Sequence, residues 1–367
     1  MKVKNNTIPF HTKIASMVSE EGKNFAISPL SIAMAFEMVK LVASEKTLEE
    51  IKEVFGDIPK INIPKDFNLQ IANSVWTTED ASEDYISLVK EKLNAEAKLI
   101  QNFNGQPINE WCSEKTNGLI DSIVDRNLDK NVSAVLINVI YFLADWLNKF
   151  NKKDTTENGN FTLFDGSKIK VPMMRKFNGN HKYYEQDGVK YVSLPYSCKD
   201  NKKPDTADKE GFSPSMILAI PPEGKSVADF ISKWNPLESS FYCYEKDFSI
   251  LAFPRFKFKW GAELITFLKK LGLLEIFTDN SKVNGILASG NHLKIGAVAH
   301  KTVVKVDENG TEAAAVTALQ FLCCAAMNKP DTKVIFVADR PFAFSIVEMN
   351  SSAVLFTGAV YDPRKED

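Results

Sequence analysis

DENGTEAAAVTALQFLCCAAMNKPDTK, residues 307–333, is the most informative stretch of this 367-residue chain. It opens on the turn signal Asn309-Gly310 and continues with small side chains. Locally, TEAAAVTAL is compatible with an Ala-rich helix and equally with an exposed, mobile linker. As a strand, it would place two different sets of side chains on its two faces. One face holds Thr311, Ala313, Ala315, Thr317, Leu319 and Phe321, and the other holds Glu312, Ala314, Val316, Ala318 and Gln320.

The first of these faces is small and then apolar, so it could enter a packed sheet without displacing large neighbours. The second face carries side chains that water tolerates. The segment can therefore be exposed in one state and form a buried central strand in another. This capacity to occupy two places is the main functional hypothesis that the sequence supports.

Strand-like patterns surround this segment. AHKTVVKVDEN, residues 299–309, alternates, with His300, Thr302, Val304 and Val306 on one side. AVLINVIYF, residues 134–142, is a continuous apolar run, as expected for a central strand covered on both faces. SMILAIP, residues 215–221, has the same character. PFAFSIVEMN and AVLFTGAVYD, near the C-terminus, predict a hairpin.

The earlier part of the chain has helical signals. Ser28 can cap a helix that begins at Pro29. Thr47 and Glu50 have the spacing of a capping box before a further helix. The stretch of residues 108–124 is predicted to be helical at its start, with Gly118 as the stop, and residues 263–272 predict a short helix. Helices and strands are partly segregated, so the predicted fold class is α+β.

Composition and net charge argue against several classes of protein. With 45 basic and 47 acidic residues the net charge is -2, which argues against a general nucleic-acid binder or a basic membrane-surface protein. The N-terminus lacks the apolar run of a cleavable signal peptide, and residues 134–147 are too short to cross a bilayer. The odd, scattered cysteines predict neither a disulfide framework nor a zinc site. Residues 198–214, polar and rich in Lys and Asp, predict a surface loop.

GTEAAAVTA, residues 310–318, closely resembles the hinge motif of the serpin family, and Glu308 stands where that family has its loop-starting Glu. The segments NFAISPLSIAMAFEMV, IANSVW, INEWCSEKTNGLI, FPRFKFKW and VLFTGAVYDP also follow the family's order. The resemblance covers almost the full length. It implies one serpin domain over residues 1–367, with a central mixed β-sheet, two further sheets, eight to nine helices and an exposed reactive-centre loop at about residues 308–333.

The resemblance implies a protease inhibitor and not an enzyme. A target serine protease, chymotrypsin- or elastase-like, would cut the loop and form an acyl-enzyme, and the loop would then insert into the central sheet. The alternatives are a cross-class inhibitor of a cysteine protease and a non-inhibitory carrier or chaperone. No cofactor, metal, nucleic acid or membrane is implied, and a monomer is expected. The chain resembles the leaderless, ovalbumin-like type, which is cytoplasmic or is released by a leaderless route.

The residues carried over from the family form two groups. The hinge comprises Glu308, Gly310, Thr311, Glu312, Ala313, Ala314 and Ala315. None of its inward positions is charged or bulky, which favours an inhibitor over a non-inhibitory relative. Ser28, Ser31, Asn138 and His300 match the positions that hold the central strands until they part, and Trp146 matches the aromatic residue at the top of the opening. An ordinary core role would also account for these five residues.

The reactive bond is expected sixteen residues after Glu308, between Cys324 and Ala325. The small thiol side chain suits an elastase-like pocket and suits a chymotrypsin-like pocket less well. Met327-Asn328 is the second choice, because the stretch up to Pro341 is long and leaves the register open. Oxidation of Cys323 and Cys324 is a further hypothesis for control of inhibition. A cysteine peptidase that uses either thiol with His300 lacks any local signature.

Overall fold

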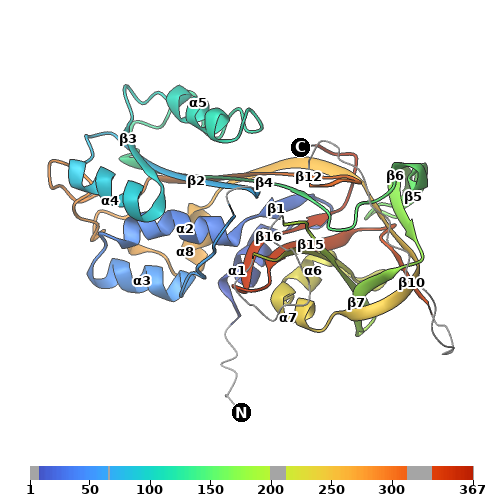
Figure 1. Cartoon of the computed structure of the whole chain (residues 1–367). Coiled ribbons are helices and arrows are strands. Elements are labelled where there is room, and N and C mark those ends of the chain that lie inside the picture. The colour runs from blue at the N-terminus through green and yellow to red at the C-terminus, as the bar shows by residue number, and fades with distance from the viewer. Residues whose placement is uncertain (1–7, 65–66, 199–211, 312–332, 367) are drawn as a thin grey trace, which may run out of the picture.

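A six-stranded mixed sheet forms the centre of the molecule in this computed structural model, which describes residues 8–64, 67–198, 212–311 and 333–366 (Figure 1). Its strands lie in the order β11 (Phe256–Glu263), β12 (Ala297–Val306), β4 (Ala134–Asp145), β2 (Asn68–Thr77) and β3 (Glu96–Leu99), and β13 (Gly310–Thr311) pairs with β4. Strand β4 is antiparallel to β2 and parallel to β12. It is the continuous apolar run of the sequence, and nearly all of its residues are buried.

A ten-stranded layer packs behind the central sheet. Its order is β1 (Phe25–Ile27), β16 (Ala353–Val360), β15 (Phe342–Glu348), β9 (Pro214–Ile220), β8 (Val189–Pro195), β7 (Asn180–Gln186), β10 (Tyr244–Pro254), β6 (Lys168–Phe177) and β5 (Thr156–Thr162), and β14 (Val334–Val337) pairs with β10. The start of β10 pairs with β7 and its end pairs with β6. The layer is therefore two sheets joined through one strand, which confirms the two further sheets expected.

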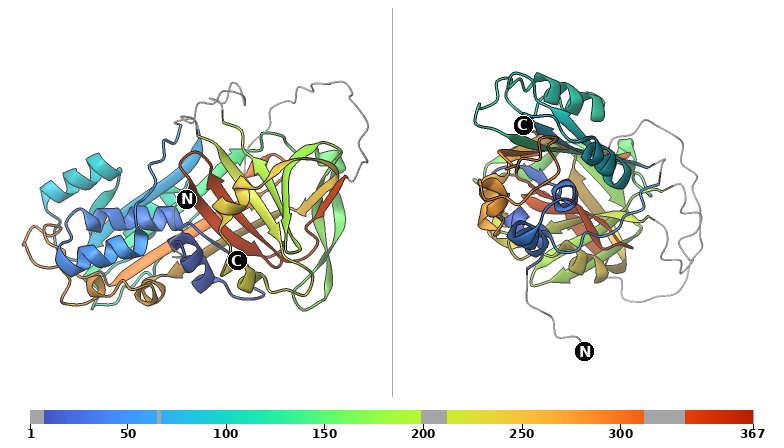
Figure 2. Two further views of the ribbon diagram at one scale, coloured as in Figure 1. Left: turned by 90° about the horizontal axis from the view of Figure 1, so that it is seen from below. Right: turned by 90° about the vertical axis from the view of Figure 1, so that its left-hand side faces the viewer.

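Eight α-helices lie within the described ranges, which agrees with the eight to nine expected. They are α1 (Phe10–Val18), α2 (Pro29–Lys40), α3 (Glu45–Phe55), α4 (Glu83–Leu93), α5 (Gln106–Lys115), α6 (Val227–Ile231), α7 (Pro236–Phe241) and α8 (Ile265–Lys270), with the short 3-10 turns η1 (Lys152–Asp154) and η2 (Glu275–Phe277). Helices α2, α3 and α4 gather at one end, and the strands of the ten-stranded layer lie at the other (Figure 2).

The two faces of the central sheet are covered differently. Helix α5 lies over one face (Figure 1), where Trp111 and Cys112 pack with Ile137 and Val139 of β4. Helix α2 lies on the opposite face and also contacts β16. Even-numbered residues of β4, such as Ile140 and Phe142, belong to the core shared with the ten-stranded layer. Each face of β4 is therefore buried against a different partner.

Most predicted elements are confirmed. Pro29 begins α2, and the Ser28 hydroxyl caps that helix by accepting the amide of Ser31 at 3.3 Å. Strands β15 and β16 form the predicted hairpin. In β12, Val304 faces the core behind the sheet and Val303 faces α5, as the alternation predicts.

The capping box predicted at Thr47 and Glu50 is wrong. Helix α3 begins earlier, at Glu45, so both residues lie inside it. The Glu50 carboxylate instead accepts the amides of Leu274 and Glu275 at 2.7 Å each. The Thr47 hydroxyl donates to the Glu275 carboxylate and accepts a backbone amide that follows η2 in the sequence. The two side chains therefore anchor a segment that is distant in sequence, which local spacing cannot distinguish from a cap.

The predicted polar loop at residues 198–214 lies outside the described residues except at its ends. Both ends are fixed, because Cys198 and Phe212 are buried and Pro214 begins β9. The ring of Phe212 packs edge-on against Phe67, with centroids 4.8 Å apart. The surface-loop prediction therefore extends too far at its C-terminal end.

Candidate functional site

The boundary between β4 and β12, here called the seam, is where the predicted site residues meet. The two strands pair in parallel where residues 297–303 of β12 lie against residues 135–141 of β4. Beyond that point β13 pairs antiparallel with β4, with Gly310 opposite Asp145 and Thr311 opposite Ala144. The first two residues of the segment predicted to insert thus already form ladder contacts at the upper end of the seam.

A buried polar cluster ties the middle of the seam to helix α2. The Asn138 side-chain oxygen on β4 accepts from Ser31 at 2.8 Å and contacts Nδ1 of His300 on β12 at 2.5 Å. The Asn138 amide nitrogen donates to the Ser31 carbonyl at 2.9 Å and to the Asn73 side chain at 2.6 Å. The Ser28 amide donates to Nε2 of His300 at 3.2 Å. These five residues are called the seam cluster. Asn73 was not predicted from the sequence.

The seam cluster fixes the protonation state of His300. A backbone amide can only donate, so Nε2 must accept from Ser28 and the single ring proton must lie on Nδ1, toward Asn138. Because burial disfavours the charged ring, the pKa of His300 is lowered from 6.5 to about 3. Protonation would place a second hydrogen against the Ser28 amide and would break the contact. The seam cluster is therefore built for a neutral imidazole.

This arrangement predicts a specific acid sensitivity. Since the pKa of His300 is lower in the folded state, the unfolded state binds more protons below pH 6.5, and stability falls as the pH drops from 6.5 toward 3. The contribution amounts to about 2 kcal/mol between pH 6.5 and 5. We expect the unfolding temperature of a His300→Gln variant to fall less steeply than that of the wild type between pH 7 and 5.

The control for this measurement is His292→Gln, which removes an exposed histidine. His11 and His181 also have pKa values lowered to about 4 by burial, so they leave a residual slope in every variant. If the two variants have the same pH profile, His300 does not titrate as proposed.

The upper end of the seam is closed by an aromatic stack. Trp146 is buried and stacks on Tyr196, with ring centroids 4.6 Å apart and planes 14° apart. Its indole nitrogen donates to the Asp307 carbonyl at 2.9 Å, and its amide donates to the Asn309 carbonyl at 2.7 Å. The Tyr196 hydroxyl lies 3.0 Å from that of Thr311. Trp146 is thus in direct contact with the start of the hinge.

Gly310 is required by the close approach of β13 to β4. Its φ is +151°, and a Cβ added there would lie 2.0 Å from the Ala144 carbonyl oxygen and 2.6 Å from Cα of Asp145. No other residue can occupy this position without moving the backbone. The conformation therefore places the hinge against the end of β4.

The carboxylate of Glu308 anchors the other side of the hinge. It is 2% exposed and accepts from Nε and Nη2 of Arg255 at 2.7 and 2.6 Å and from the Thr155 hydroxyl at 2.5 Å. Burial raises its pKa, but the hydrogen bonds from Arg255 and Thr155 outweigh burial, so the pKa of Glu308 lies below its ordinary value. The Glu308 carbonyl also accepts the Phe150 amide at 2.8 Å.

Residues 116–128, called the α5 tail, form a second connection across the seam. Asn117 donates to the Tyr141 hydroxyl on β4 at 2.7 Å. Lys301 of β12 donates to the Ser122 carbonyl at 2.7 Å, and Lys259 of β11 lies 3.8 Å from Asp121. The α5 tail is therefore tied to the strands on both sides of the seam.

The remaining predicted site residues lie outside the described residues. They are the hinge positions Glu312, Ala313, Ala314 and Ala315 and the proposed cleavage positions Cys324, Ala325, Met327 and Asn328. Within the described ranges, no group of three or more His, Cys, Asp or Glu side chains could hold a metal ion. None of the described helices is long and apolar enough to cross a membrane.

Comparisons with known proteins agree on one family. A model described as "Serpin (serine protease inhibitor)" matches residues 5–363. An uncharacterised serpin-like protein of Thermococcus kodakarensis is 32% identical, over 93% of this chain and 81% of its own length, and Serpin-Z10 of Arabidopsis thaliana is 29% identical, over 98% and 97%. The solved structure of human thyroxine-binding globulin complexed with thyroxine superposes with a TM-score of 0.81 at 23% identity, over 97% of each chain.

Proposed function

The chain belongs to the serpin family, and on that premise we propose that it inhibits a chymotrypsin- or elastase-like serine endopeptidase as a suicide substrate. The peptidase serine attacks the carbonyl of Cys324 in the loop of residues 308–333, and the amine of Ala325 leaves. The cut loop then enters the seam before water can release the acyl-enzyme.

The register of β13 on β4 is the observation that carries this proposal. Continuing the pairing of Thr311 with Ala144 would bring Ala313 opposite Phe142 and Ala315 opposite Ile140. Residues directly opposite in an antiparallel pair share a face, and these positions of β4 face the core behind the sheet. The small side chains of the hinge would therefore occupy the core face, as the sequence pattern requires.

The same register would bring Thr317 opposite Asn138, in the seam cluster. Inserting a strand separates β4 from β12, so the contact between Asn138 and His300 must break during insertion. A hydroxyl arriving at that height can replace one of the lost partners, which limits the cost of opening a buried polar cluster. Further along, Leu319 and Phe321 would contribute apolar burial.

The α5 tail gives a kinetic prediction. Because the tail is tied to both sides of the seam, opening must release Lys301 from Ser122 or stretch the segment between its two ties. We expect Lys301→Met to speed insertion about 2- to 5-fold, the effect of one exposed hydrogen bond of about 0.5–1 kcal/mol. The measurement is the rate of tryptophan fluorescence change after the loop is cut.

The control for the α5 tail is Lys168→Met on β6, an exposed lysine far from the seam in the fold. Equal rates for the wild type and both variants would exclude a role for the tail in insertion.

The proposed function is tested by incubation with chymotrypsin, pancreatic elastase and, for the cross-class alternative, a papain-like peptidase. We expect a covalent complex that survives denaturing electrophoresis with at least one serine enzyme. The released peptide should begin at Ala325 by mass spectrometry, or at Asn328 if Met327 is the residue that is cut. Cleavage of the loop by every enzyme without any covalent complex would refute inhibition.

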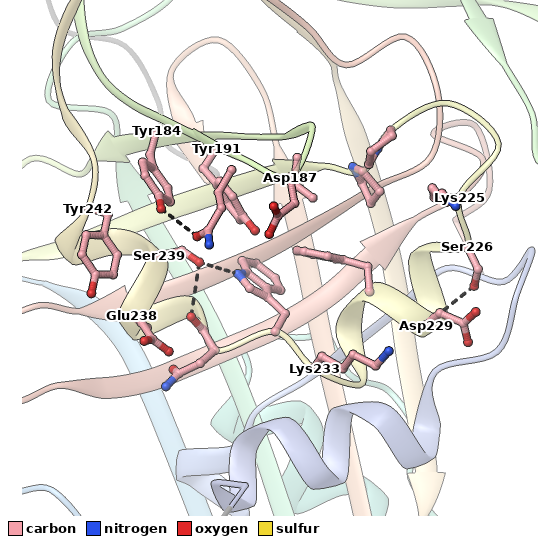
Figure 3. Close-up of a pocket in the computed structure, with 17 residues that line it drawn as sticks. Tyr184, Asp187, Tyr191, Lys225, Ser226, Asp229, Lys233, Glu238, Ser239 and Tyr242 are labelled. Carbon is pink, nitrogen blue, oxygen red and sulfur yellow. Dashed lines mark hydrogen bonds between the residues drawn. The ribbon is translucent and has the colours of Figure 1, made fainter. Parts of the chain in front are cut away.

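A carrier is the second candidate, and one cavity favours it. The cavity, of about 720 Å³, lies between β7–β8 and α6–α7 (Figure 3). Tyr184 stacks on Tyr191 and on Tyr242, with centroids 5.8 and 5.4 Å apart, and Trp234 also lines the space. This volume is typical of small-molecule sites. A protein that only carries a ligand should not become more heat-resistant when its loop is cut, whereas an inhibitor should.

A further inference from the structure

A second cavity, of about 450 Å³, lies where the hinge begins. Its walls come from β6 at Val171 and Pro172, the β10–β11 corner at Arg255, the end of β12 with the following Asp307 and Glu308, the turn η1 at Lys152, and the C-terminal residues Pro363, Arg364 and Glu366. Segments from five separate parts of the sequence therefore meet around one small space. The mechanism proposed above uses none of this space.

One wall presents a guanidinium held in a fixed orientation. Nε and Nη2 of Arg255 are bound by Glu308, and Nη2 also lies 3.4 Å from Glu157. Arginine has five N–H donors, so Nη1 of Arg255 keeps donors that these carboxylates do not use. The Arg255 side chain is 32% exposed and lines the cavity.

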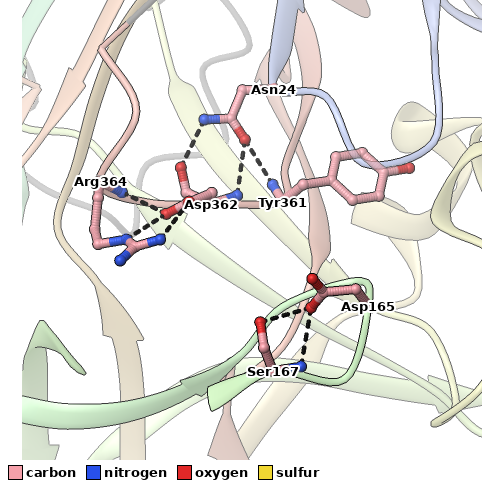
Figure 4. A network of polar contacts seen from close by, with 6 residues as sticks. All are labelled: Asn24, Asp165, Ser167, Tyr361, Asp362 and Arg364. Atoms are coloured by element: carbon pink, nitrogen blue, oxygen red, sulfur yellow. Dashed lines mark hydrogen bonds and ion pairs between the residues drawn. The ribbon is translucent and has the colours of Figure 1, made fainter. Parts of the chain in front are cut away.

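A second guanidinium among the lining residues belongs to Arg364 (Figure 4). Arg364 donates from Nε and Nη2 to the two oxygens of Asp362 at 3.0 and 2.9 Å. The C-terminal segment that carries Arg364 is itself fixed, because the Asn24 side chain binds the amides of Tyr361 and Asp362 and the carbonyl of Asp362. Arg364 is 52% exposed and also keeps unused donors. Its position is therefore set before any ligand arrives.

Cationic side chains outnumber carboxylates among the residues that line this cavity. Five cationic side chains line it, Lys152, Arg255, Lys257, Lys305 and Arg364, against three carboxylates, Asp307, Glu308 and Glu366. Glu308 is already bound by Arg255, and Glu366 lies 3.6 Å from Lys257. Asp307 accepts the Asn309 amide at 2.8 Å. Glu157 and Asp362, which pair with Arg255 and Arg364 outside the lining, bring the carboxylates to five, so an anion would be attracted by the guanidinium donors and not by a net charge.

We propose that this cavity binds a compact small molecule that carries at least two phosphate or carboxylate groups. Two preoriented guanidinium groups match the planar, paired oxygens of such anions better than lysines alone would. A volume of about 450 Å³ accommodates a small metabolite.

Binding there would act on the hinge. Asp307 and Glu308 line the cavity, and the backbone from Gly310 onward enters the seam. A ligand that joins the C-terminal segment to the β10–β11 corner restrains the segment that moves when the loop inserts. This regulatory consequence rests on the proposed inhibitory function, whereas the binding itself does not.

Isothermal titration calorimetry on the uncut full-length protein tests the binding, with inorganic pyrophosphate and citrate as separate probes at low ionic strength. We expect one site for at least one probe. In the double variant Lys152→Gln and Arg364→Gln, affinity should fall about 10- to 100-fold, as expected for the loss of one charge-assisted hydrogen bond. Neither residue is part of the seam or the hinge. Pyrophosphate and citrate distinguish phosphate from carboxylate recognition.

The matched control is Lys130→Gln with Lys168→Gln, which removes two exposed lysines outside the cavity. Equal loss of affinity in both double variants would show non-specific attraction and overturn the proposal. The proposal is also overturned if neither pyrophosphate nor citrate binds. No peptidase is present, so this result is independent of the covalent-complex assay. If the ligand binds and a peptidase is trapped, slower insertion with ligand supports regulation of the hinge, and an unchanged rate refutes it.

Discussion

Replacing Thr311 by Arg should convert the protein from an inhibitor into an ordinary substrate. Thr311 is 1% exposed, its hydroxyl lies 3.0 Å from that of Tyr196, and it pairs with Ala144 at the entrance of the seam. A guanidinium here can leave the core of the uncut protein if the two-residue strand β13 detaches, whereas an inserted strand would hold it on the core face. Because burial of an unpaired charge costs several kcal/mol, insertion should slow and hydrolysis of the acyl-enzyme should win.

The expected readout for Thr311→Arg is a fall of at least about 10-fold in the fraction of peptidase held as covalent complex, since each 1.4 kcal/mol on the insertion barrier slows it tenfold. The cleaved product should rise in proportion. Thr311→Ser keeps the hydroxyl and should behave as the wild type does. Asn309→Arg adds the same charge at a half-buried neighbour outside the β13 ladder and should inhibit normally. Efficient trapping by Thr311→Arg would mean that burial of this position does not control insertion.

The sequence predicted the features that depend on local pattern. The alternation of β12 follows from period-two placement of side chains, and the apolar run of β4 follows from burial of both faces of that strand. The polar positions Asn138 and His300 were expected to act together because of the resemblance to the serpin family, and they do meet, with Nδ1 of the histidine 2.5 Å from the asparagine oxygen. Fold class was therefore accessible without coordinates.

Partners that are distant in sequence were not predictable in this way. Arg255, Thr155 and Tyr196 are ordinary surface-type or strand residues until the fold places them against Glu308 and Thr311. Asn73 likewise gains its role only through the pairing of β2 with β4, which sets it opposite Asn138. The Thr47 error has the same origin, because its partners lie more than 200 residues away.

Three separate groups of contacts hold the seam closed. The aromatic stack at Trp146 closes the top, the seam cluster at His300 holds the middle, and the α5 tail crosses the outer face. An inserting strand enters from β13 and so meets the aromatic stack before the seam cluster. This order of contacts implies that substitutions near Glu308 change the rate at which insertion starts. Substitutions at His300 change the rate at which insertion continues.

Glu308→Lys should produce the largest loss of stability in the native, uncut protein. The substitution removes the carboxylate that binds Arg255 and Thr155 and puts a second positive charge beside Arg255. Breaking a buried ion pair costs about 3–5 kcal/mol, and the partial exposure of Arg255 places the expected loss at the lower end of that range. The unfolding temperature should fall by about 5 °C or more, and uncut protein should lose inhibitory capacity on warming.

Charge reversal at both positions separates the ion pair from other effects of Glu308→Lys. Adding Arg255→Glu restores opposite charges, so a double-mutant cycle should give a favourable coupling, and strictly additive losses would show that the pair does not hold the hinge.

The pH dependence gives an independent test with Glu308→Gln. Because the pKa of Glu308 lies below its ordinary value in the folded protein, its contribution is present above that ordinary value and is lost as the pH falls through the lowered one. The stabilities of wild type and Glu308→Gln should therefore differ at neutral pH and approach each other as the pH falls below the ordinary pKa of a glutamate.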